Sequence, residues 1–168
     1  FQGRAPWLFV NLITAVIASV VIGFFESTIE KVVALAVLMP IVASMGGNAG
    51  TQTVTVAVRA IAMREFSPKV VVTFGLRELY VGMANGLIFA VVTAGLSYVW
   101  FGDAQIALVL GIAMLVNMVV AAISGTLIPL SLVKVGVDPA IASSVFITTI
   151  TDVIGFLVFL GLAALYLL

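Results

Sequence analysis

Five long runs of uncharged, mainly apolar residues constrain the fold of this 168-residue chain more than any other feature. Only one charged side chain interrupts them. A helix that crosses a bilayer needs roughly 20 consecutive, mainly apolar residues. The runs cover residues 5–25, 32–58, 79–102, 104–133 and 139–168. The one charge is Asp152, about halfway along the last run. We therefore predict an all-α bundle of five transmembrane helices within one domain, residues 4–168. The predicted spans are about 5–25, 32–63, 76–102, 104–133 and 139–168.

The composition supports an integral membrane protein. Hydrophobic residues make up 64% of the chain and charged residues 8%, whereas an ordinary soluble domain is about a quarter charged. The strands of a transmembrane barrel alternate polar and apolar residues in segments of about ten, and these runs are apolar on all faces. Seven basic residues balance seven acidic ones, so the chain lacks the concentrated basic patch that a nucleic-acid partner requires. The expected surroundings are a lipid bilayer and no nucleic acid.

Cysteine and histidine are both absent. Their absence excludes disulfides, thiolate chemistry, zinc sites with the usual ligands and imidazole acid–base catalysis. A metal ion bound by this chain must therefore be met by oxygen ligands, which hard cations such as Mg²⁺, Ca²⁺ and Mn²⁺ prefer.

Basic residues gather at one end of the predicted spans. Short loops rich in Lys and Arg stay on the cytoplasmic side. Arg4 precedes the first span, and Lys134 lies between the fourth and the fifth. Four more lie between the second span and the start of the third: Arg59, Arg64, Lys69 and Arg77. Only Lys31 falls on the other side. The sequence predicts a multi-pass protein of the cell membrane with its N-terminus in the cytoplasm and its C-terminus outside.

The second span contains residues that disturb a helix. Pro40 removes a backbone hydrogen bond, and Gly46, Gly47 and Gly50 permit bends or the close approach of another helix. We expect a kinked or partly unwound helix there. Carbonyl groups freed at membrane depth are tolerated only where protein or a cavity covers them.

A candidate cation site lies near the middle of the second and fifth spans. At 1.5 Å per residue, Asn48 lies roughly 22 Å and Asp152 roughly 20 Å from the cytoplasmic ends of their helices, so the two share a depth. A carboxylate is costly inside a membrane and usually marks function there. With the carbonyls around Gly46 and Gly47 these side chains form an oxygen-lined site for a cation. Thr148 shares a helix face with Asp152 and could add its hydroxyl or its carbonyl.

Structural explanations compete with this interpretation. Small residues let membrane helices approach, and Asn side chains hydrogen-bond across the contact, so the glycine and amide run could serve packing alone. Asn85 and Asn117, in the third and fourth spans, could do the same. Asp152 could pair with a buried base, although no Arg or Lys lies mid-span. The Thr148 hydroxyl could bond back to its own helix.

Arg77 and Glu78 mark the predicted cytoplasmic start of the third span. An interfacial ion pair or a gate contact is one interpretation of these two residues. A solvated pair is the default for charged neighbours at a membrane surface.

Several short motifs occur together in this chain. They are Pro40 followed by GGNAGTQ at 46–52, Arg59-Ala60, GVDPA at 136–140 and TTITDVIG at 148–155. In combination they resemble the membrane domain of the MgtE family of magnesium channels and transporters, over residues 5–168. Some relatives carry Asn-Pro or Gly-Pro where this chain has Ser144-Val145, so the resemblance assigns no ligand at Ser144.

The resemblance implies a homodimer of five-helix subunits with a pore on the two-fold axis, lined mainly by the second and fifth helices. It implies that Asp152, Asn48 and the carbonyls around Gly46 and Gly47 hold a largely hydrated Mg²⁺ ion; Mn²⁺, Ca²⁺ and Co²⁺ stay open as alternatives. Family members carry a cytoplasmic magnesium-sensing part before the first span. Residues 1–3 look like the remnant of a cleavable tag, and we expect an excised domain whose N-terminal cytoplasmic regulatory part is missing.

Three other functions fit parts of the sequence. A proton-coupled secondary transporter could use Asp152 as its coupling carboxylate. An intramembrane protease is disfavoured, because a Ser–His pair is impossible and one chain has a single mid-span Asp. A purely structural anchor would leave Asp152 unexplained. We predict a magnesium channel or transporter domain and not an enzyme.

Overall fold

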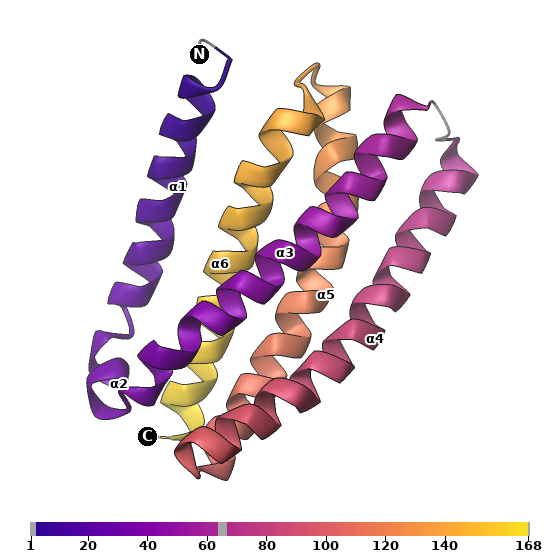
Figure 1. The fold of residues 1–168 in the computed structure, drawn as a ribbon. Coiled ribbons are helices and arrows are strands. Elements are labelled where there is room, and N and C mark those ends of the chain that lie inside the picture. Colours follow the sequence, from indigo (N-terminus) through magenta and orange to yellow (C-terminus); the bar gives the residue numbers. More distant parts are fainter. Residues whose placement is uncertain (1–2, 64–66, 168) are drawn as a thin grey trace.

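A computed structural model describes residues 3–63 and 67–167. Within these residues the chain forms six α-helices and no strand (Figure 1). The helices are α1 (Ala5–Gly23), α2 (Glu26–Lys31), α3 (Ala34–Ala62), α4 (Pro68–Phe101), α5 (Ala104–Lys134) and α6 (Pro139–Tyr166). All except the short α2 are long and apolar enough to cross a membrane. The prediction of an all-α fold with five spans is confirmed, whereas α2 was not anticipated.

Some sequence-based predictions fall on positions outside the described residues. These are Phe1 and Gln2 of the predicted tag remnant, the basic residue Arg64, and the last residue of the fifth span, Leu168.

Helix α4 begins at Pro68 rather than near residue 76 as predicted. The Ser67 hydroxyl oxygen accepts a hydrogen bond from the Val70 backbone N–H at 3.4 Å, and Pro68 occupies the first turn. A serine cap followed by proline is a favourable helix start, because proline has no N–H to leave unpaired there. The earlier start places Arg77 and Glu78 inside α4 rather than at its entrance.

Helix α3 is unbroken although it contains Pro40 and a group of glycines. The expected partial unwinding is therefore absent from the structure. Neighbouring helices support the glycine segment from outside: a Cβ added at Gly50 would lie 2.5 Å from Cγ2 of Ile147 in α6. Such packing, more than intrinsic propensity, stabilises most helices in proteins.

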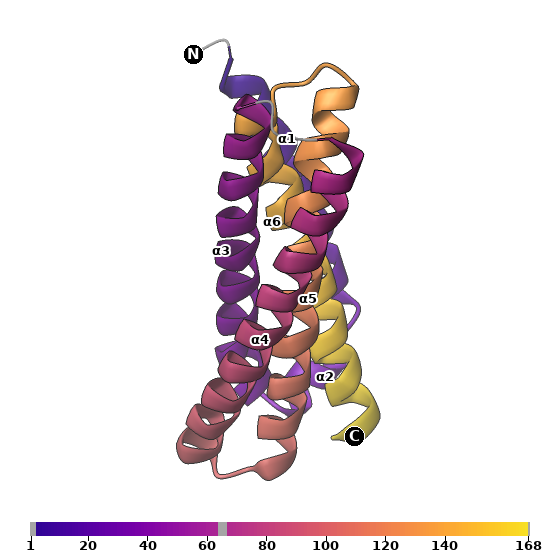
Figure 2. The same ribbon diagram turned by 90° about the vertical axis from the view of Figure 1, so that its right-hand side faces the viewer.

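Helix α5 lies at the centre of the bundle. It packs against α3, α4 and α6, and α1 packs on the outside of α6. Accordingly, α5 is the most buried of the five long helices and α1 is the least buried. Figures 1 and 2 show the long helices running side by side between two ends of the molecule.

The two ends carry different charges. The start of α1, the end of α3, the start of α4 and the α5–α6 turn lie at one end, and α2, the α4–α5 turn and the end of α6 lie at the other (Figure 1). The first end holds the basic residues Arg4, Arg59, Lys69 and Lys134. The start of α1 and the end of α6 lie at opposite ends, which agrees with an odd number of spans; the side of the membrane on which each end lies stays a prediction.

Capping side chains and glycines shape the two turns. Asp103 caps α5 by accepting hydrogen bonds from the backbone N–H of Gln105 at 2.8 Å and of Ile106 at 3.3 Å. Asp138 caps α6 by accepting one from Ala140 at 3.0 Å. Gly102 and Gly136, which precede them, have φ angles of 69° and 79°, a backbone conformation that favours glycine. The two aspartates therefore stabilise the first turns of α5 and α6.

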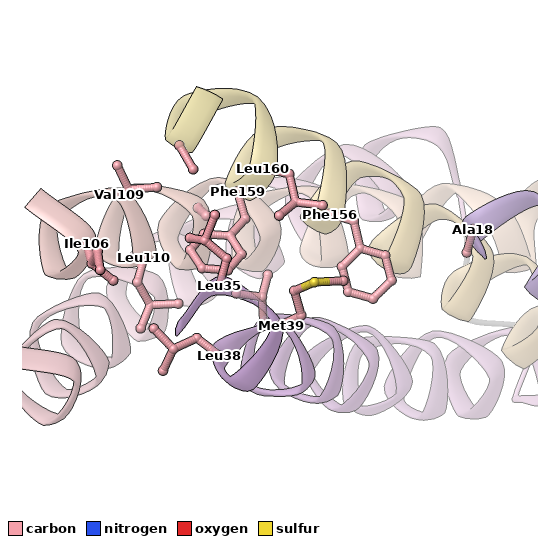
Figure 3. Packing of buried hydrophobic residues seen from close by; sticks show 13 residues of the cluster. Ala18, Leu35, Leu38, Met39, Ile106, Val109, Leu110, Phe156, Phe159 and Leu160 are labelled. Atoms are coloured by element: carbon pink, nitrogen blue, oxygen red, sulfur yellow. The ribbon is translucent and has the colours of Figure 1, made fainter. Parts of the chain in front are cut away.

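A cluster of buried apolar side chains lies mainly between α3, α5 and α6. Figure 3 shows Leu35, Leu38 and Met39 of α3 meeting side chains of the other two helices. Those side chains are Ile106, Val109, Leu110, Ala113, Phe156, Phe159, Leu160 and Ala163. These residues lie in the first halves of α3 and α5 and in the second half of α6. The polar segments of α3 and α6, around Asn48 and Asp152, therefore lie outside this cluster, nearer the other end of the bundle.

Candidate ion site

One face of α3 exposes a row of polar side chains along much of a membrane-spanning helix. We call this the outer polar row; it consists of Ser44, Asn48, Thr51, Gln52 and Thr55, all of them exposed in the single chain. Asn48 donates from Nδ2 to Ser44 Oγ at 3.5 Å. Polar groups that face hydrocarbon without partners are costly, so this face of α3 is suited to water or to another protein surface.

The opposite face of α3 is built from small residues that allow close helix contact. Gly46 is buried, and a Cβ there would collide with the side-chain amide of Asn117 in α5. Gly47, in contrast, has no atom near the position of a Cβ. Its carbonyl accepts a hydrogen bond from the Thr51 hydroxyl at 2.8 Å. Of the two glycines predicted to offer carbonyl ligands, Gly46 lies in a helix contact and Gly47 lies beside the outer polar row.

Asn117 is fully buried and connects three helices. Its Nδ2 donates to the backbone carbonyl of Val42 in α3 at 3.0 Å. A Cβ at Gly155 of α6 would lie 2.9 Å from the same nitrogen. The Oδ1 of Asn117 has no hydrogen-bond partner within the described residues. The packing interpretation of Asn117 therefore fits its surroundings better than a ligand role.

Asp152 lies near the midpoint of α6 and is half-buried. Within the part of the chain that the structure describes, its carboxylate accepts no hydrogen bond and pairs with no basic side chain. The alternative of a buried ion pair is therefore not observed in the single chain. An unpaired carboxylate at this position requires water, a cation or a second subunit.

The threonines beside Asp152 differ in their partners. Thr149 donates to the Val145 carbonyl at 2.7 Å, and Thr151 donates to the Ile147 carbonyl at 2.8 Å. The Thr148 hydroxyl makes no such bond within the described residues, and its side chain is exposed. Thr148 also lines a cavity of about 390 Å³ between α1 and α6. Its hydroxyl, one helical turn before Asp152, is available to a ligand.

A second cavity lies where α3 and α4 diverge over α5. Its volume is about 310 Å³. The polar residues that line it are Asn48, Gln52 and Thr53 of α3 and Glu78 and Asn85 of α4. The Thr53 hydroxyl donates to Glu78 Oε2 at 3.2 Å. Sequence reasoning missed this site because it placed Glu78 at a span entrance next to Arg77, which the structure leaves exposed. The Ser67-Pro68 helix start was the available signal.

The predicted ligands are only partly brought together in one subunit. Asp152 and Thr148 lie one turn apart on α6, whereas Asn48 lines the cavity beside α4. No group of three or more His, Cys, Asp or Glu side chains forms a metal cluster among residues 3–63 and 67–167. A single subunit thus offers one carboxylate per site, and amide, hydroxyl and carbonyl oxygens supply the rest.

Comparisons with known proteins identify relatives of this chain. The sequence profile of the MgtE family, described as a divalent cation transporter, matches residues 39–162. Proteins called magnesium transporter MgtE are 36% identical in Bacillus subtilis, 34% in Thermus thermophilus and 33% in Enterococcus faecalis. Each match covers 98% of this chain and 36% of the relative. The chain therefore spans about a third of the length of these relatives.

Proposed function

Because this chain belongs to the MgtE family of divalent cation transporters, we propose that it forms the ion pathway of a magnesium channel or transporter. The observation that carries the proposal is the unpaired Asp152 carboxylate on α6, together with the outer polar row on α3. Both are exposed at least in part on the outside of a bundle that also exposes many large apolar side chains. Neither suits contact with lipid tails.

A homodimer with a two-fold axis would remove Asp152 and the outer polar row from contact with lipid. A second copy placed against α3 and α6 would cover both polar surfaces and leave an aqueous pore between the subunits. Two Asp152 carboxylates would then face one pore and together offset the charge of a divalent ion. One subunit alone supplies only half of that charge, so dimerisation and transport depend on each other.

The ligand set suits a hydrated magnesium ion. Mg²⁺ releases its waters reluctantly and requires octahedral oxygen coordination. The pore would bind the ion's water shell through Asp152, Asn48, the Thr148 hydroxyl and the Gly47 carbonyl. The predicted Gly46 carbonyl is not included, because Gly46 is buried against Asn117 of α5. The Gly47 carbonyl already accepts a hydrogen bond from the Thr51 hydroxyl. It can bind the ion's water shell through its second lone pair, or after the Thr51 hydroxyl has rotated away.

The charge distribution supports a defined orientation in the cell membrane. The end of the bundle with Arg4, Arg59, Lys69 and Lys134 would lie in the cytoplasm, following the preference of basic loops for that side. The N-terminus would then be cytoplasmic and the C-terminus outside.

A proton-coupled transporter is the second candidate. The observation that favours it is again the unpaired carboxylate of Asp152, because a coupling site in a secondary transporter needs a group that binds and releases a proton at membrane depth. Dependence of flux on a proton gradient distinguishes this candidate from a channel.

Magnesium flux into proteoliposomes tests the proposal. We expect wild-type flux without a proton gradient and a loss of at least about tenfold in Asp152→Asn, because one hydrogen bond to a charged group contributes about 1.5–3 kcal/mol. Glu30→Gln is the matched control, since it removes an exposed carboxylate at the end of the bundle. Wild-type flux in Asp152→Asn would contradict the proposal, and flux that requires a proton gradient would favour the coupled transporter.

A further inference from the structure

The cavity between α3 and α4 contains a carboxylate, Glu78, that the pore around Asp152 does not use, although Asn48 lines this cavity as well. We propose that it binds a second divalent cation in each subunit, with Glu78 as the charged ligand. Its position follows from the packing of α3, α4 and α5; the choice of a divalent ion as ligand rests on the proposed function.

The size of the cavity suits a hydrated ion. Its volume of about 310 Å³ corresponds to roughly ten water molecules at about 30 Å³ each. A bare ion would leave most of this space unfilled, whereas an ion with its first water shell and a few further waters occupies it. Polar side chains line one part and apolar ones such as Val81 and Phe89 line another.

The charge in the cavity is uncompensated. Glu78 lies within the membrane-spanning helix α4 and is half-buried. Its only hydrogen bond within the described residues comes from Thr53, and no basic side chain pairs with it there. The adjacent Arg77 is exposed, and Lys134 is the last residue of α5. A carboxylate in such a place needs a cation or ordered water.

The remaining polar groups complete an oxygen ligand set. A carboxylate offers about four acceptor positions, and Thr53 uses one of them. Asn85 follows Glu78 by two helical turns and lies on the same side of α4. Asn48 and Gln52 face the same cavity from α3. Carboxylate and amide oxygens are the donors that hard divalent ions prefer.

The number of bound ions distinguishes this site from the pore. A site on a two-fold axis binds one ion for every two chains, whereas the α3–α4 cavity occurs once in each chain. Mn²⁺ serves as the probe, because its free aqueous form gives an electron paramagnetic resonance signal that disappears on binding. We expect about three Mn²⁺ ions per two wild-type chains.

Two variants separate the sites. Glu78→Gln should lose about one Mn²⁺ ion per chain, and Asp152→Asn about one per two chains. Glu30→Gln, at an exposed position of α2, should bind as the wild type does. Wild-type stoichiometry in Glu78→Gln would overturn the inference. Loss of one ion per chain in Glu78→Gln would support the inference whatever Asp152→Asn does. Wild-type binding in Asp152→Asn would then contradict the pore site at Asp152 and not the cavity site.

Conservative variants keep the inference testable if Glu78→Gln does not fold. Glu78→Asp keeps the charge but shortens the side chain, so the stoichiometry should persist while the affinity for Mn²⁺ falls several-fold. Thr53→Val removes the hydrogen bond to Glu78 and should also weaken binding. Bound ion should raise the Tm of the wild type; the same rise in Glu78→Asp and Thr53→Val as in the wild type would overturn the inference.

Discussion

At the scale of single residues, neighbouring positions with the same chemistry have different surroundings. Gly46 and Gly47 are adjacent in α3, yet a Cβ at Gly46 would collide with Asn117 and a Cβ at Gly47 would meet open space. Thr148 and Thr149 differ likewise, because only the Thr149 hydroxyl bonds back to its helix. These differences assign Gly46 to helix packing and leave Gly47 and Thr148 accessible.

The glycine pair gives a direct test of this assignment. We expect Gly46→Ala to lower the free energy of unfolding by about 1–3 kcal/mol, the usual cost of overpacking a tight contact. Gly47→Ala should be neutral or stabilising by up to about 1 kcal/mol, because alanine has the higher helix propensity. Reversible unfolding in detergent micelles measures both. Equal losses in the two variants would contradict the close contact between Gly46 and Asn117.

The sequence predicted some residue roles and not others. Asp152 could be identified because a lone charge in a long apolar run is rare and costly. The contact between Gly46 and Asn117 could not be predicted. A glycine indicates that another helix approaches closely but not which residue does so, and Asn117 lies far away in the sequence. The position of Glu78 was missed for a local reason: the helix start at Ser67-Pro68 was not recognised.

At the scale of helices, two internal prolines occupy opposite environments. Pro40 is exposed in the second turn of α3, whereas Pro129 is fully buried in α5. The five spans were predictable from runs of apolar residues that match the thickness of a bilayer. The continuity of α3 could not be predicted, because the sequence does not show the contacts that α5 and α6 make with its glycine segment.

The proline pair tests whether α3 is a regular helix. Pro40→Ala restores a backbone hydrogen bond without loss of packing, so the free energy of unfolding should rise by about 1–3 kcal/mol. Pro129→Ala should gain less or lose stability, because it leaves space in a packed interior. Thermal unfolding in the same detergent compares the two. A lower Tm for Pro40→Ala than for the wild type would indicate that α3 requires a bend there.

At the scale of the whole molecule, the proposed homodimer depends on the exposure of the outer polar row and on the half-buried Asp152. A polar face on a membrane span is acceptable only where water or protein covers it. The sequence implied a dimer through its family resemblance, and the exposure of these side chains gives that expectation a physical basis.

Thiol labelling tests whether the outer polar row faces water. These 168 residues include no cysteine, so Thr55→Cys and Val91→Cys each introduce a single thiol. Both positions are exposed in the single chain, but Val91 belongs to an apolar surface of α4. A membrane-impermeant thiol reagent should modify Thr55→Cys quickly and Val91→Cys slowly, because thiolate forms readily only in water. Equal rates at the two positions would contradict an aqueous pore beside α3.

The most direct test of the account is magnesium flux through dimers of mixed composition. Wild-type and Asp152→Asn chains are coexpressed in equal amounts, purified together and reconstituted into proteoliposomes. If each pore needs both carboxylates, only dimers of two wild-type chains conduct, and the flux should fall to about a quarter of the wild-type value. Flux of about one half would show that each subunit conducts independently and would contradict a shared site on the two-fold axis.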